Sequence, residues 1–172
     1  MNEAVDFKSM INTSRGKVYL LWAVIVGAGF VSTHYYQNSN INIVWAVLSI
    51  IGFAYMYKVM PLGASQMKRI FMAWLIPVSI GMIWSVVAVM TDLLPELVYY
   101  LGSFWLIVMA AGYVWNGLVD RPGLWYYVVG VVNLIAAGVI YLSFDLLFVQ
   151  YLLVAVVGVW SMLMLWLFRA DT

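Results

Sequence analysis

The sequence predicts an all-α fold, a polytopic transmembrane helical bundle with six spans. Of the 172 residues, 66% are hydrophobic and only 9% are charged, whereas soluble domains average about 45–50% and about 25%. The apolar residues also gather into long runs, and roughly 20 residues of helix are needed to cross about 30 Å of hydrocarbon. Since so few charged residues cannot cover a soluble domain, we expect lipid to be the solvent of this surface.

Six apolar runs of near-spanning length follow one another along the chain. They are predicted at 18–36, 41–60, 70–90, 97–119, 124–142 and 146–168. None alternates with the period of two that a membrane barrel requires, so helices are favoured. The predicted organisation is therefore a cytoplasmic N-terminal segment at 1–17, a six-helix transmembrane domain at 18–168, and a cytoplasmic tail at 169–172.

The segments between the runs contain residues typical of helix ends. They include Gln37 to Asn40, Pro61 with Gly63, Asp92 with Pro95, Asp120 to Gly123, and Ser143 with Asp145. Polar caps and prolines of this kind begin or end helices. Because all the connections are short, consecutive helices are expected to be antiparallel neighbours.

Basic residues predict the orientation. With six spans, all eight fall on one side of the membrane: Lys8, Arg15, Lys17, Lys58, Lys68, Arg69, Arg121 and Arg169. Basic loops stay in the cytoplasm during insertion. We therefore expect a multi-pass protein of a prokaryotic cytoplasmic membrane with both termini in the cytoplasm.

The runs show signs of an internal repeat. Trp22 and Gly29 have the same spacing as Trp74 and Gly81, and Trp125 opens the fifth run in a corresponding place. The even-numbered runs carry Gly52 before Tyr55, Gly112 before Trp115, and Gly158 before Trp160. This pattern fits three tandem antiparallel hairpins. The alternative is the general preference of Trp and Tyr for both membrane interfaces.

Polar residues and prolines within the runs are candidate functional positions, because polar groups are costly in a bilayer. Asn133 is deep in the fifth run, where it could line a solute path or hydrogen-bond to a neighbouring helix; the second is favoured. Asn116 is expected to behave similarly. Pro77 is expected to kink the third span, as a feature of shape more than as a gate.

One set of titratable residues is predicted at the extracytoplasmic rim: His34, Asp92, Glu96 and Asp145. Three carboxylates and an imidazole at one mouth could attract a cation. The alternative, which explains most of the pattern, is that the acidic residues cap helix starts and that His34 lies at a wet interface.

Several function classes are excluded by what the sequence lacks. It contains no cysteine and a single histidine, so thiolate metal sites, HExxH zinc sites and haem held by two histidines are ruled out. No phosphate-binding glycine loop or nucleophile elbow is present. We therefore expect no enzymatic activity and no cofactor. A net charge of +1 argues against a nucleic-acid partner.

Three functions remain open. The leading expectation is an accessory subunit, stress-related factor or assembly scaffold that acts through helix packing, with the lipid bilayer and a membrane-protein partner or a second copy of the chain as its contacts. The alternative is a small permease or channel for a neutral or cationic solute, with Asn133 and Pro77 along its path. The second alternative is a lipid- or quinone-binding protein that uses Trp84, Trp105 or Trp160.

Overall fold

The computed structural model describes residues 13–36, 40–60, 63, 65–91, 98–120 and 123–169. Its long helices are α2 (Ser14–Tyr35), α3 (Ile41–Val59), α4 (Ser65–Met90), α6 (Leu101–Val119), α7 (Leu124–Leu142) and α8 (Gln150–Arg169), and the 3₁₀ helix η1 (Phe144–Val149) leads into α8. Counting η1 with α8, six helices in these ranges are long and apolar enough to cross a membrane. The predicted six-span helical bundle is confirmed.

Helix ends differ from the predicted spans mainly where polar residues adjoin them. α2 begins at Ser14, before the apolar run, because the Thr13 hydroxyl caps it by accepting the Gly16 N–H at 2.9 Å. α4 begins at Ser65 rather than at residue 70. Hydropathy marks where lipid begins, whereas the helix continues into the polar interface and ends where its backbone is capped.

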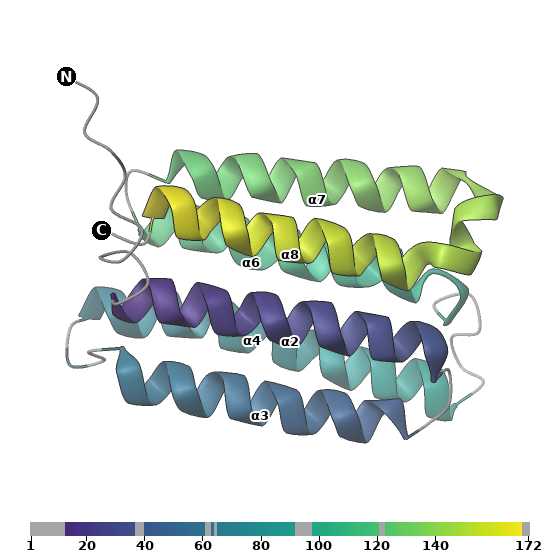
Figure 1. Ribbon diagram of the computed structural model, residues 1–172, viewed down its shortest axis with the longest axis horizontal. Helices are drawn as coiled ribbons and strands as arrows, with labels where there is room; N and C mark the ends of the chain where they lie inside the picture. The colour runs from purple at the N-terminus through teal and green to yellow at the C-terminus, as the bar shows by residue number, and fades with distance from the viewer. Residues whose placement is uncertain are drawn as a thin grey trace.

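The helices form a closed ring of antiparallel neighbours (Figure 1). Each helix contacts the next along the chain, as the short connections predicted, and α8 returns to pack on α2 in the most extensive contact of all. The contact between α3 and α4 is the least extensive between consecutive long helices. α3 lies at one edge of the bundle, and only 17% of its span is buried.

The two ends of the bundle differ in charge. We call the end at which α2 begins and α8 ends the terminal end, and the opposite end the distal end. Within the described ranges, all basic residues lie at the terminal end, in the end turns of their helices: Arg15, Lys17, Lys58, Lys68, Arg69 and Arg169. This is the same segregation on which the predicted orientation was based.

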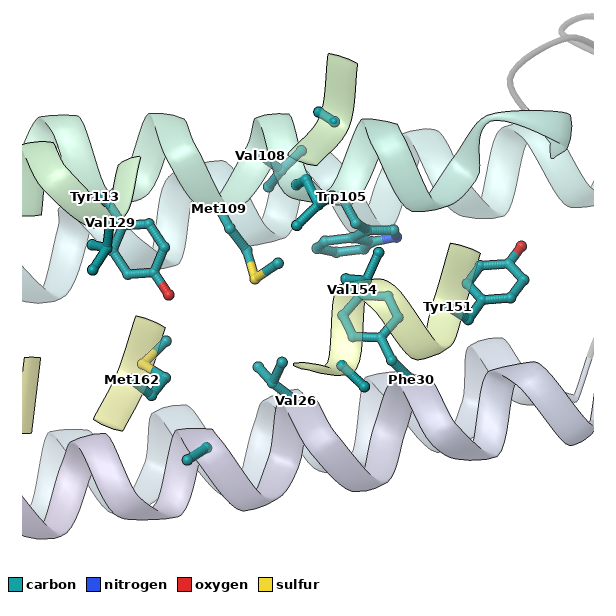
Figure 2. Close-up of a cluster of buried hydrophobic side chains, with 14 of the residues drawn as sticks. Val26, Phe30, Trp105, Val108, Met109, Tyr113, Val129, Tyr151, Val154 and Met162 are labelled. Atoms are coloured by element: carbon teal, nitrogen blue, oxygen red, sulfur yellow. The ribbon is translucent and has the colours of Figure 1, made fainter. Parts of the chain in front are cut away.

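The core of the bundle runs between α2, α6 and α8. Val26, Met109, Val154 and Met162 all belong to this cluster of buried side chains (Figure 2). In lipid the hydrophobic effect does little to hold helices together, so close packing and interhelical hydrogen bonds carry more of the stability. The contacts that matter most for this fold are therefore those of small residues and buried polar groups.

Reciprocal tryptophan–glycine contacts join the helices of the first two hairpins. Trp22 of α2 lies against Gly52 of α3, where an added Cβ would be 2.8 Å from the indole, and Trp45 lies against Gly29 in return. The second hairpin repeats this arrangement: Trp74 of α4 lies against Gly112 of α6, and Trp105 lies against Gly81. The spacing noticed in the sequence thus corresponds to paired contacts that let neighbouring backbones approach closely.

The third hairpin keeps the spacing but changes the residues. In α8, Tyr151 and Gly158 have the seven-residue spacing of the tryptophan–glycine pairs. In α7, the positions that correspond to Trp74 and Gly81 are Tyr126 and Asn133. The sequence-based assignment of Trp125 is therefore corrected by one residue. Trp125 instead stacks on Phe168, with ring centroids 3.8 Å apart.

Candidate functional site

A cavity of about 550 Å³ lies in the distal half of the bundle, where ligand pockets of roughly 300–1,000 Å³ are typical of proteins. Its wall comes from α2, α3, α4, α6, η1 and α8. The lining side chains are Phe30, Thr33, Ile41, Asn42, Trp45, Met82, Ser85, Val89, Val98, Tyr99, Leu101, Trp105, Phe144, Leu147, Phe148, Gln150 and Tyr151. Among the described lining residues none is Asp, Glu, Lys, Arg or His, so this part of the wall is apolar with a few neutral polar groups.

Aromatic rings form one wall of the cavity. The indoles of Trp45 and Trp105 are stacked, with centroids 6.0 Å apart and planes 13° from parallel. The Phe30 ring lies 4.6 Å from Trp45 and points toward Trp105 (Figure 2). The glycine contacts of Trp45 and Trp105 fix the benzo ends of these indoles against neighbouring helices, so this wall is preformed.

Two hydroxyls of the cavity wall donate to carbonyls of their own helices, one in α2 and one in α4. Thr33 donates to the Gly29 carbonyl at 2.8 Å and accepts the Trp45 indole N–H at 2.8 Å. Ser85, at the matching position of α4, donates to the Gly81 carbonyl at 2.8 Å. Both side chains line the cavity, and both satisfy their hydroxyl protons within the protein.

Gln150 fixes the start of α8 against the start of α6. Its Oε1 accepts the Gly102 N–H at 2.7 Å, and its Nε2 donates to the Tyr99 carbonyl at 2.9 Å. Because Gly102 has no side chain, the amide of Gln150 occupies the space where a Cβ would lie. These two bonds join α6 to α8 at one side of the cavity, and α3 lines another side.

The position of α3 explains why space remains there. α6 and α8 contact each other across the bundle, and α3 makes no comparably extensive contact with either. α3 and α4 meet through Phe53, Tyr57 and Phe71, which form ring contacts of 5.9 and 6.2 Å. These contacts lie toward the terminal end, whereas Ile41, Asn42 and Trp45 at the other end of α3 line the cavity.

At the terminal end, one buried carboxylate joins all the long helices except α3. Asp120, directly after α6, is only 2% exposed. Arg15 of α2 donates to both of its oxygens, at 2.8 and 3.2 Å, and Arg169 of α8 donates to Oδ2 at 2.9 Å. Gln66 of α4 donates to Oδ1 at 3.2 Å. Charge-assisted bonds of this kind are about twice as strong as neutral ones.

Two tyrosines extend this charge cluster into the bundle. Tyr126 of α7 donates its hydroxyl to Asp120 at 3.1 Å, because an ionised carboxylate can only accept. Its oxygen is therefore the acceptor in the 2.6 Å contact with Tyr19, and Tyr19 is the donor. The chain of hydrogen bonds has one direction, from Tyr19 through Tyr126 to Asp120.

The charge cluster determines the ionisation of Asp120. Burial alone would raise the pKa of this carboxyl, but the hydrogen bond from Arg169 and the charges of Arg15 and Arg169 hold the pKa below its ordinary value of 3.8. A cavity of about 20 Å³ adjoins Arg15, Tyr19 and Tyr126. This volume accommodates about one water molecule, which is too small for a larger ligand. The charge cluster at the terminal end therefore joins helices, and the distal cavity is the candidate ligand site.

The structure shows how Asn133 is held. Its Nδ2 donates to Ser161 of α8 at 2.8 Å and to the Val129 carbonyl of its own helix at 2.7 Å. Asn133 and Ser161 are fully buried, and neither cavity described above is lined by Asn133. Of the two predicted roles, the interhelical hydrogen bond is present, and the solute path along Asn133 gains no support.

We expect the hydrogen bond between Asn133 and Ser161 to contribute about 0.6–1.7 kcal/mol to stability, the range measured for such bonds between membrane helices. A double-mutant cycle of Asn133→Ala and Ser161→Ala, followed by thermal unfolding in detergent, measures this coupling. The matched cycle of Asn116→Ala with Ser161→Ala should give a coupling near zero. Equal coupling in both cycles would contradict the assignment.

Asn116 and Pro77 both lie within long helices, and the kink predicted at Pro77 stays a prediction. The interhelical bond expected for Asn116 is not made in the described chain: its Nδ2 returns to the Gly112 carbonyl one turn earlier, at 2.8 Å, because that acceptor is within reach in a helix interior. Pro77 lies within α4, which continues from Ser65 to Met90 on both sides of it.

Part of the predicted cation rim can be placed. His34 is half-buried in the last turn of α2 beside the Tyr35 ring, and Asp145 is exposed in the first turn of η1. Asp92 and Glu96 lie outside the described residues. Within those residues, no three His, Asp or Glu side chains gather into a metal site, and the complete rim stays a prediction.

The charge cluster was missed by the sequence analysis, which treated Asp120 as part of a connection. Its partners are far away along the chain, at Arg15, Gln66 and Arg169. One signal could have found it: Asp120 is an acidic residue in a connection on the side where the basic residues gather. The cavity had a weaker signal, since Trp105 alone of its residues was singled out.

Comparisons with known proteins do not assign the chain. No protein-family model matches it, and no curated protein or solved structure is significantly similar to it. The fold is that of a six-span helical membrane protein, and the candidate ligand site is supported by the geometry and chemistry of its own residues.

Proposed function

We propose that this integral membrane protein binds a lipid-soluble molecule in its distal cavity. The observation that carries the proposal is the cavity itself, about 550 Å³ of apolar, aromatic-walled space beside a tightly packed core. Pockets with mostly apolar walls and a few placed polar groups are the usual sites of small ligands in proteins. The proposal is of a binding protein, and it assigns no catalytic step to any residue.

The orientation we propose places this cavity in the outer half of the membrane. The basic residues of the described chain lie at the terminal end, which supports a cytoplasmic location for that end and for both termini. The distal cavity then borders the outer leaflet of a cytoplasmic membrane, where a lipid-soluble molecule is available.

The other expected functions have less support. Scaffolding through helix packing would use an exposed apolar face such as that of α3, but lipid covers such a face equally well, so this role and its protein partner stay predictions. A permease would need a route through the bundle, and the close packing around Asn133 and Ser161 gives such a route no support. The cavity favours the lipid- or quinone-binding alternative.

Filling the cavity should remove the ligand. Ser85→Phe places a phenyl ring in the cavity without breaking an interhelical hydrogen bond, because the Ser85 hydroxyl bonds only to its own helix. Ser79→Phe is the matched control, on the exposed surface of the same helix. Mass spectrometry of apolar molecules that co-purify with the full chain should show at least a tenfold loss in Ser85→Phe and no loss in Ser79→Phe.

Thermal unfolding, followed by tryptophan fluorescence, checks that both variants are folded. If the native protein carries no more of any apolar molecule than folded Ser85→Phe does, the cavity is not a ligand site and the proposed function is wrong.

A further inference from the structure

We infer that the ligand of the distal cavity carries an uncharged carbonyl head group on an apolar body. This inference rests on the function proposed above. Isoprenoid quinones and acylglycerols share this chemistry, whereas anionic phospholipids do not. Three features of the cavity lead to this class: the absence of charge in its described wall, the hydrogen-bonding state of its polar groups, and the shape of its aromatic wall.

The described wall offers no positive charge to an anionic head group. The described lining residues include no charged side chain, and an anion taken out of water without a partner is strongly disfavoured. The basic residues lie at the other end of the bundle. Thr33, in the cavity wall, is separated from Arg15 by about 27 Å of helix at about 1.5 Å per residue. A phosphate in the cavity would therefore lack a counter-charge.

Three polar side chains of the wall already have partners. Thr33 both donates and accepts, Ser85 donates its proton to its own helix, and the amide of Gln150 uses its oxygen and nitrogen to join α6 to α8. A ligand would have to break these bonds to use the same atoms. These polar groups therefore shape the cavity and are not the expected hydrogen-bond partners of the ligand.

Asn42 differs from these groups. It lies in the first turn of α3, lines the cavity, and has a buried side-chain nitrogen with no hydrogen-bond partner. An unsatisfied buried donor is costly, and the cost is relieved when an acceptor binds. A carbonyl oxygen on an otherwise apolar molecule supplies that acceptor without bringing charge into the cavity.

The internal repeat shows that this donor is specific to one hairpin. In each even-numbered span, an aromatic residue is followed seven positions later by glycine. The residue three positions before that aromatic is Asn42 for Trp45, Gly102 for Trp105 and Phe148 for Tyr151. At Gly102 the space is filled by Gln150. The amide therefore occurs on α3, the span with the smallest buried share, and it lines the cavity.

The aromatic wall suits a flat or extended apolar body. The nearly parallel indoles of Trp45 and Trp105 and the ring of Phe30 present flat surfaces, against which a ring stacks or a chain lies. The wall thus binds the body of the ligand, and Asn42 is expected to bind its carbonyl.

Native mass spectrometry of the full chain in detergent tests this inference with three probes: a benzoquinone bearing a ten-carbon chain, dioleoylglycerol, and dioleoylphosphatidylglycerol. At least one neutral probe should bind to the native chain and should bind less to Ser85→Phe. The identity of that probe distinguishes a quinone from an acylglycerol. Asn42→Leu, which keeps the size of the side chain but removes the donor, should weaken that binding about tenfold. Asn42→Gln retains an amide donor and should bind within about threefold of the native chain.

The outcomes separate this inference from the proposed function. Two results would overturn the inference while the cavity remains a ligand site. The first is that phosphatidylglycerol binds as tightly as the neutral probes and loses its binding in Ser85→Phe. The second is that the neutral probes bind folded Asn42→Leu as well as they bind the native chain. If no probe binds to the native chain and no apolar molecule co-purifies with it, both are wrong.

Discussion

Replacing Asp120 by asparagine is expected to lower the stability of the protein by about 3–5 kcal/mol, the usual result of removing one partner of a buried ion pair. The variant keeps the shape of the side chain, but it leaves Arg15 and Arg169 without their shared carboxylate and turns an amide N–H toward other donors. Because the carboxylate joins α2, α4, α7 and α8 to the end of α6, the loss should affect closure of the whole ring.

Thermal unfolding in detergent, followed by the fluorescence of the nine tryptophans, measures this effect. Asp145→Asn is the matched control, since Asp145 is exposed in η1 and its substitution should change stability by no more than about 0.5 kcal/mol. Equal losses in the two variants would show that the charge cluster has no special role.

The difference in stability between the native chain and Asp120→Asn is expected to depend on pH. The pKa of Asp120 in the folded chain lies below its ordinary value of 3.8. A carboxyl of this kind contributes stability above its unfolded pKa and loses it as the pH falls through the folded pKa. The advantage of the native chain over Asp120→Asn should therefore be constant from pH 7 to about pH 5, and should shrink below about pH 4.

Gly112→Leu is expected to destabilise the protein by at least about 1–3 kcal/mol, the usual effect of overpacking a core. A Cβ at Gly112 would lie 2.9 Å from the Trp74 ring, and that ring is packed edge-on against Tyr113. A leucine side chain there would overlap the indole, so either Trp74 or the two helices must shift. The second substitution in Gly112→Leu/Trp74→Ala should restore part of the lost stability.

Gly138→Leu provides the matched control for this substitution. Gly138 is also within a membrane helix, but a Cβ there would meet nothing within 4 Å, and leucine favours helix more than glycine by up to about 1 kcal/mol. Its melting temperature should be unchanged or higher. If both leucine variants are destabilised alike, the tryptophan–glycine contacts are not what holds the hairpins together.

The fold was largely predictable because lipid imposes a simple rule on sequence. The fifth span, 124–142, coincides with α7, and the other helices were located to within a few residues. Two of the differences arise at Thr13 and Ser65, where polar residues begin a helix outside the hydrocarbon, and a third is that α6 begins at Leu101 although the fourth span was predicted from residue 97. Hydropathy cannot detect such starts, because they depend on capping and on neighbouring helices.

The candidate site was much less predictable, because it depends on contacts between distant segments. Arg15 and Arg169 look like ordinary interfacial basic residues until the ring closes around Asp120. The cavity lies where α3 makes no extensive contact with α6 or α8, and nothing in the sequence of α3 alone indicates this arrangement. Asn42 resembles a helix-start residue, and its role is suggested only by the buried, unpartnered nitrogen.

The central claim is that the distal half of the bundle encloses a preformed space occupied by a lipid-soluble molecule. A crystal structure of the protein grown from a lipid phase tests it most directly. The account predicts non-protein density between Trp45, Trp105 and Ser85, reaching the amide of Asn42. A structure in which the distal half of α3 packs directly on α4 and α6, with side chains filling that space, would contradict it.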